Sequence, residues 1–195
     1  MSAPSHADPI LTLEPFLDAV RDGLDGEGWE LSGLQKTTSY EFEGRWAGES
    51  SRSAYLFFHR EDLPDWASID AFLDETSRGL RGNLALVLDG PVLARIRDPG
   101  RAMEGLTVLA RDALPRGYQA PLTLRYRLPD LGENAAGADT EIRIKLVLPK
   151  EAMRSGFSAV SALAATAARA FQEIMRSPGL QPYWPEEDGS GSLGV

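Results

Sequence analysis

Two segments in the second half of the chain alternate strictly between apolar and polar residues, and this pattern limits the fold more than any other feature. The apolar positions are Leu122, Leu124, Tyr126 and Leu128 in the first segment and Ile142, Ile144, Leu146 and Leu148 in the second. A two-residue period is typical of a strand with one buried and one solvated face. The connection PDLGENAAGADT contains no helix that would carry a parallel crossover. The two strands are therefore expected to pair antiparallel.

The rest of the chain mixes helical and strand-like patterns. Apolar residues at helical spacing predict helices at about 13–24, 68–82, 99–114 and 155–176. Shorter apolar or alternating runs predict strands from residue 29 and at 40–46, 53–59, 84–88 and 92–96. Together these patterns predict an α+β fold, with a mostly antiparallel sheet of about six to seven strands, helices packed mainly on one face, and a long C-terminal helix.

The chain is long enough for one full-sized domain. Its 195 residues, of which 43% are hydrophobic, supply enough apolar surface for a packed core. The last stretch, GLQPYWPEEDGSGSLGV, is rich in proline, glycine and acidic residues, a composition that resists regular structure. We therefore expect a single α+β domain over residues 1–178 and a flexible tail over 179–195.

Charge and cysteine content exclude several classes of function. With 20 basic and 29 acidic residues, the net charge of −9 opposes broad binding to nucleic acids or to anionic membranes. The absence of cysteine excludes disulfides, thiolate nucleophiles, cysteine zinc sites and iron–sulfur clusters. No segment predicts a secretory leader or a membrane span. The expectation is a soluble, cytoplasmic protein without a cofactor or a metal.

The junction AYLFFHRED, at 54–62, is the first place to look for chemistry. Its strand is apolar on both faces, which predicts a central strand buried on both sides. His59 and Glu61 share one face of that strand and have the residue types of a general base or a metal site, but Asp62 points away and no third ligand is evident. The favoured interpretation is a strand that leaves the core. His59 and Glu61 stay as catalytic candidates for an alternative function, an enzyme or small-ligand-binding protein with a pocket near His59.

The polar faces of the two alternating strands suggest a binding surface. If the strands pair, four cationic side chains project from the same side of the sheet: Arg125, Arg127, Arg143 and Lys145. One hypothesis is that this basic patch binds a partner protein with an acidic surface or an acidic peptide. The other is that the patch is an ordinary solvated sheet face, diluted by Thr123 and Glu141.

Two further features point to partners. Tyr183 and Trp184 lie in a proline-rich, acidic context, so they form either a linear docking motif or a plug that folds back onto the domain. The helix at 155–176 is rich in alanine, and its small side chains allow the close approach of a second copy in a homodimer. Alanine is also the best helix former, which explains the same pattern without a partner.

These features favour a non-enzymatic protein-binding or accessory protein, adaptor-like or chaperone-like, that presents a sheet face and its C-terminal tail to another protein. A small acidic chain of antiparallel strands and flanking helices is broadly similar in architecture to bacterial secretion chaperones, a comparison that rests on no sequence motif. Neither nucleic acid nor membrane insertion is expected.

Overall fold

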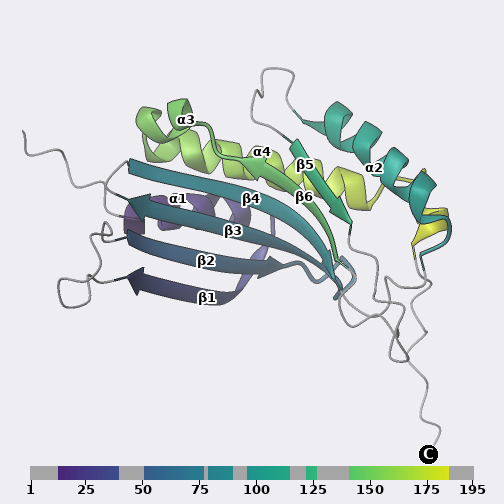
Figure 1. The fold of residues 1–195 in the computed structure, drawn as a ribbon, viewed down its shortest axis with the longest axis horizontal. Helices are drawn as coiled ribbons and strands as arrows, with labels where there is room; N and C mark the ends of the chain where they lie inside the picture. The colour runs from purple at the N-terminus through teal and green to yellow at the C-terminus, as the bar shows by residue number, and fades with distance from the viewer. Residues whose placement is uncertain are drawn as a thin grey trace, which may run out of the picture.

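The computed structural model describes residues 13–39, 51–76, 79–89, 96–114, 122–126 and 141–184. Along the chain, the elements are α1 (Leu13–Asp25), β1 (Glu30–Ser39), β2 (Ser51–His59), β3 (Ala67–Thr76), β4 (Gly79–Asp89), α2 (Pro99–Ala113), β5 (Leu122–Tyr126), β6 (Glu141–Val147), α3 (Lys150–Ser155), α4 (Phe157–Met175) and the short 3₁₀ helix η2 (Gln181–Tyr183). The α+β class with an antiparallel sheet is confirmed (Figure 1). None of the described helices has the length and apolarity needed to cross a membrane.

One sheet contains six strands in the order β1-β2-β3-β4-β6-β5, and every neighbouring pair is antiparallel. β1 to β4 follow the order of the chain, whereas the chain passes through α2 after β4 and returns at the far edge as β5. The predicted antiparallel pairing of the two alternating segments is confirmed, with Leu124 opposite Ile144. β6 then lies between β5 and β4, with Leu146 opposite Leu84.

Helices α1 and α4 cover one face of the sheet, and no described helix covers the other face (Figure 1). The apolar residues on the covered face are Ala54, Leu56, Phe58, Ile69, Ala71, Leu73, Leu84, Leu86, Leu88, Ile142, Ile144 and Leu146, all at most 2% exposed. α1 and α4 approach each other closely at Gly23. A Cβ atom at this position would lie 2.3 Å from the carbonyl oxygen of Ser161. Glycine is therefore required there for the two helices to pack as one layer.

The prediction of a helix at 68–82 is wrong, because this segment contains β3 and the start of β4. Ile69, Ala71 and Leu73 are buried at alternate positions, while Asp70 and Phe72 project to the opposite face. The spacing of Ile69, Phe72 and Leu73 matches a helix as well as a strand. Pairing with β2 and β4 on both sides decided between them.

A side-chain cap marks the beginning of α2, and a glycine marks the beginning of α4. Asp98 precedes Pro99, and its carboxylate accepts a hydrogen bond from the backbone N–H of Arg101 at 3.2 Å. The sequence predicts that Ser155 caps the following long helix, but Ser155 ends α3. Gly156, with φ of 98°, separates α3 from α4 in a conformation that favours glycine.

Ordered structure continues beyond the predicted domain boundary at residue 178. Leu180 is 1% exposed and Trp184 is 7% exposed, so both belong to the core. The domain therefore includes residues 179–184, and the rest of the predicted tail lies outside the described residues. The predicted strand at 40–46 and most of the one at 92–96 lie outside them as well.

Candidate functional site

Three aromatic side chains gather on the face of the sheet that no described helix covers. Tyr55 and Phe57 of β2 and Phe72 of β3 form this cluster, which is called the aromatic patch below. Tyr55 lies opposite Phe72, their ring centroids are 4.6 Å apart, and 39% of Tyr55 is exposed. The expectation that β2 is buried on both sides is therefore wrong. Its Leu56 and Phe58 are buried against the helices, while the alternate residues face outward.

A glycine in the neighbouring strand makes room for the aromatic patch. Gly33 of β1 lies opposite Phe57. A Cβ atom at Gly33 would lie 3.2 Å from Cδ2 of the Phe57 ring. The ring therefore lies against the backbone of β1, where a side chain would otherwise push it away.

An ion pair borders the aromatic patch on the side of β4 and β6. Asp70 is the direct neighbour of Phe57 in the pairing of β2 with β3. Its carboxylate accepts a hydrogen bond from Arg143 of β6 at 2.8 Å, and Arg143 also lies 3.4 Å from Glu141. Burial raises the pKa of Asp70 above its ordinary value, and the guanidinium of Arg143 only partly offsets this effect. The pair is thus partly desolvated before any partner arrives.

A second ion pair lies further along the same face. Asp74 of β3 is 7% exposed and accepts a hydrogen bond from Arg81 of β4, with the shortest nitrogen–oxygen distance at 2.6 Å. The guanidinium side is open to solvent, since 72% of the Arg81 side chain is exposed. The aromatic patch is therefore bordered by charges that already have partners.

The predicted basic patch overlaps this region. Arg143 projects from β6 as expected, but Asp70 and Glu141 balance its charge. Lys145 lies on the same face, partly buried, opposite Ala85 and Thr123. The side chain of Arg125 and all of Arg127 lie outside the described residues. Binding of an acidic partner by these four cations stays a prediction.

The catalytic candidates His59 and Glu61 are both exposed. His59 is exposed at the end of β2, opposite Glu30 of β1, and Glu61 is exposed in the following turn. In the described ranges, no three histidine, aspartate or glutamate side chains are grouped so that they could hold a metal ion.

The other two charged residues of the junction have structural contacts. Arg60 donates hydrogen bonds to Asp62, at 2.5 Å, and to the backbone carbonyl of Glu27. Asp62 also pairs with Arg176 at the end of α4. The hydrogen bond from Arg60 and the two nearby guanidinium groups hold the pKa of Asp62 below its ordinary value. Arg60 and Asp62 thus join the turn after β2 to the helical layer.

The C-terminal aromatics divide between core and surface. Trp184 packs on Trp66, with ring centroids 5.6 Å apart, and only 7% of Trp184 is exposed. The carbonyl of Tyr183 accepts a hydrogen bond from the backbone N–H of Arg97 at 3.3 Å. Of the two hypotheses for this segment, the structure favours the plug for Trp184, while Tyr183 is partly buried beside it.

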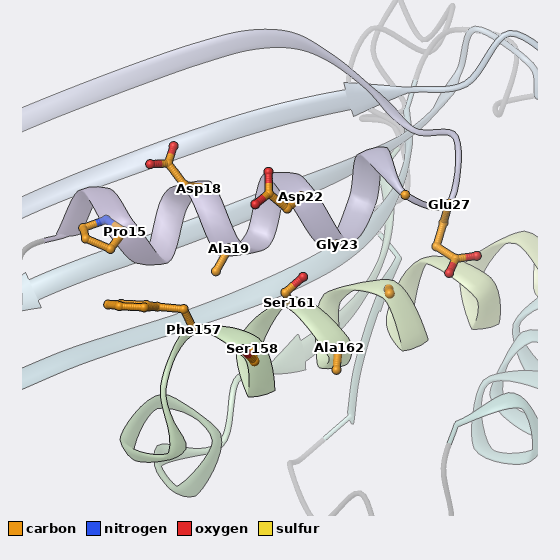
Figure 2. A pocket seen from close by; sticks show the side chains of 12 residues that line it. Pro15, Asp18, Ala19, Asp22, Gly23, Glu27, Phe157, Ser158, Ser161 and Ala162 are labelled. Atoms are coloured by element: carbon orange, nitrogen blue, oxygen red, sulfur yellow. The ribbon is translucent and has the colours of Figure 1, made fainter.

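A groove on the outer side of the helical layer runs between α1 and α4 (Figure 2). Its volume is about 570 Å³, and it contains the exposed face of the alanine-rich helix considered for a homodimer. Asp18 and Asp22 of α1 line it on one side, and Phe157 and Ser161 of α4 line it on the other. Small residues and carboxylates of this kind are common on solvated helices, so the groove identifies no ligand.

The sequence analysis does not predict the aromatic patch, because its three aromatic residues disturb the alternation of apolar and polar residues in β2 and β3. The spacing of Phe72 favours the incorrect helix prediction at 68–82. Tyr55 and Phe57 favour the incorrect prediction that β2 is buried on both sides. The alternation of Ile69, Ala71 and Leu73 was the available signal for the correct strand. No protein-family model, curated protein or solved structure matches the chain.

Proposed function

We propose that the chain is a non-enzymatic protein-binding protein of the accessory type, and that its partner docks on the open face of the sheet. The observation that carries this proposal is the aromatic patch on a face that no described helix covers. An antiparallel sheet that faces water usually presents alternating polar residues on that side. Three neighbouring aromatic rings in that position are better explained by a surface that becomes covered.

The arrangement of charge supports a protein partner. Protein interfaces place aromatic residues at a desolvated centre and polar groups at a hydrated rim. Here the aromatic patch takes the central position, with the Asp70–Arg143 and Asp74–Arg81 pairs beside it. Because these charges are already paired, a partner does not have to neutralise them, and its matching surface is expected to be largely uncharged.

The strength of such a contact follows from the exposed area. A tyrosine side chain contributes roughly 200 Å² when it is fully covered. Since 39% of Tyr55 is exposed, about 80 Å² remains for a partner to cover. At about 25 cal/mol per Å², covering it contributes ~2 kcal/mol, or about a thirty-fold change in Kd.

The other surfaces considered from the sequence support the proposal less. Trp184 contributes to the core of its own domain, so the docking role is assigned to the sheet face and not to this side chain. The alternative of a pocket near His59 has less support, because the described ranges contain no group of three histidine, aspartate or glutamate side chains that could hold a metal ion.

The test is a comparison of captured proteins. Full-length chain, its Tyr55→Glu variant and a Val108→Glu control are immobilised and exposed to lysate of the source organism, and bound proteins are quantified by mass spectrometry. Val108 is 42% exposed on α2, so it receives the same charge at similar exposure away from the patch. We expect a protein that the wild type and the control retain and that Tyr55→Glu loses at least about ten-fold. If every captured protein binds Tyr55→Glu as well as it binds the control, the open face is not the docking surface.

A further inference from the structure

β1 forms one edge of the sheet and exposes apolar side chains there. It is ten residues long, and no described strand pairs with its outer side. Leu31 is 36% exposed and Leu34 is 50% exposed. Edge strands expose unpaired backbone N–H and C=O groups, and proteins usually protect them with charged residues, bulges or a covering element. β1 carries two of these protections, the charged Lys36 and a bulge at Ser32, but the two leucines stay exposed beside them, so the edge is only partly protected.

Both leucines point toward the side of the sheet that carries the helices. Leu34 lies opposite the buried Leu56, and Leu31 lies opposite the buried Phe58. A recess of about 200 Å³ runs between α1 and β1, with Leu17, Leu34 and Leu56 among its lining residues. The edge thus offers a row of backbone hydrogen-bonding groups and, next to it, a recess that is lined by four leucines and by four charged residues, Glu14, Asp18, Arg21 and Lys36.

We propose that a second copy of the chain pairs with this edge, β1 against β1 in antiparallel orientation, and joins the two sheets into one. Directly opposite residues in an antiparallel pair point to the same face. A two-fold axis perpendicular to the sheet must therefore pass through a residue position, and it keeps the helices of both copies on the same side. Leu31 and Leu34 both lie on that side, and Leu34 is the more exposed, at 50% against 36%. The proposal therefore places the axis at Leu34, which brings the two Leu34 side chains together.

The bulge in β1 determines the remaining contacts. Leu31 and Gly33 pair with the adjacent residues Phe58 and Phe57, so Ser32 is an extra residue in the ladder. Counted along the ladder from Leu34, Leu31 of one copy lies opposite Lys36 of the other.

The charges around these positions are complementary. Leu31 lines a second recess together with Arg21, Asp25 and Glu30, where Arg21 pairs with Asp25 at 3.3 Å and Glu30 supplies the remaining negative charge. Lys36 of the second copy enters this acidic neighbourhood, and its aliphatic stem covers Leu31. Symmetry repeats the contact, so each dimer contains it twice.

The predicted association is moderate in strength. One strand pair and the recesses beside it bury less than a standard interface, and interfaces of this class are weak. We expect the mass of 21.2 kDa to rise toward 42.4 kDa, twice that value, as the protein concentration increases. This association uses the edge of the sheet and does not depend on the open face or its partner.

Sedimentation velocity of the purified full chain from about 1 to about 300 µM tests the association. Leu34→Glu places two carboxylates on the axis and should weaken the dimer at least about ten-fold, with circular dichroism confirming that the variant is folded. Val108→Glu adds the same charge at similar exposure and should leave the dimer unchanged. A wild type that stays monomeric at the highest concentration, or a dimer that Leu34→Glu does not weaken, overturns the proposal.

A thiol at the axis tests the register independently. The chain contains no cysteine, so Leu34→Cys supplies its only thiol. Opposite residues in an antiparallel pair have Cα atoms about 4.5–5.5 Å apart, within the range of a disulfide. Mild oxidation should convert Leu34→Cys into a covalent dimer well above the background given by Val108→Cys. Equal yields from the two variants place the axis elsewhere and refute the proposed register.

Discussion

Replacing Gly23 by alanine should destabilise the protein, although the same change in an unobstructed helix usually stabilises it. A Cβ atom at Gly23 would lie 2.3 Å from the carbonyl oxygen of Ser161 and 2.9 Å from Cβ of Ala164. Carbon atoms in good contact are about 3.5–4.0 Å apart, so α1 has to move away from α4 by about 1 Å. The obstruction includes backbone, so no side-chain rotation relieves it.

The magnitude follows from two opposing effects. Extra volume in a packed interior costs about 1–3 kcal/mol, and a clash with backbone belongs at the upper end of that range or beyond it. The helix propensity of alanine returns about 1 kcal/mol relative to glycine. The net loss is therefore ~2 kcal/mol, which lowers Tm by about 4–8 °C in a chain of this size.

Urea denaturation followed by circular dichroism measures this loss, with Gly100→Ala as the matched control. Gly100 lies in the first turn of α2, where the nearest atom to a new Cβ is a carboxylate oxygen of Asp98 at 3.6 Å. That variant should be as stable as the wild type or slightly more stable. A Gly23→Ala protein whose stability equals or exceeds that of the wild type would refute the close packing of α1 on α4.

Two further predictions concern the open face and the C-terminal segment. Burial raises the pKa of Asp70 above 3.8, so its ionised form is disfavoured in the folded state; Asp70→Asn should therefore raise Tm at pH 7, and this advantage should shrink as the pH falls through the raised pKa toward 3.8. If calorimetry shows that the gain in Tm of Asp70→Asn over the wild type grows as the pH falls, the predicted direction is wrong. Ending the chain before Gly179 removes the buried Leu180 and Trp184; at ~4 kcal/mol for a lost large core side chain, Tm should fall by at least about 8 °C, whereas an unchanged Tm would show that the segment is not part of the core.

The strands at the far side of the sheet could be predicted from the sequence because each one has a clean alternation. Every second residue of β6, from Ile142 to Leu146, is buried, and the register with β5 follows the same period. The start of α2 could also be predicted from the sequence, because the Asp98–Pro99 pair defines it through a local side-chain cap. Local patterns of this kind require no knowledge of which strands become neighbours.

The open face could not be predicted, for reasons that lie in its own residues. Phe72 breaks the alternation of β3, and Tyr55 and Phe57 break that of β2, so apolar residues occupy both faces of each strand. Local rules tend to fail at functional positions, where a side chain is selected for a contact outside its own fold. The residues that misled the sequence interpretation are the ones that form the aromatic patch.

Contacts between distant parts of the chain could not be predicted from local sequence patterns either. Asp70 and Arg143 are 73 residues apart in the sequence. They form a hydrogen bond across β4, because the strand order places only β4 between β3 and β6. Strand order depends on the return of the chain after α2, which no local pattern determines. The docking of Trp184 on Trp66 likewise depends on where the end of the chain lies in the fold.

Binding of the captured partner to the aromatic patch is the measurement that tests the proposed function most directly. The purified partner is titrated against the wild type, Tyr55→Glu and Val108→Glu by isothermal calorimetry. The exposed area of Tyr55 predicts that Kd rises at least about thirty-fold in Tyr55→Glu and changes less than about two-fold in Val108→Glu. Equal affinities for the two variants would contradict the assignment of the open sheet face as the docking surface.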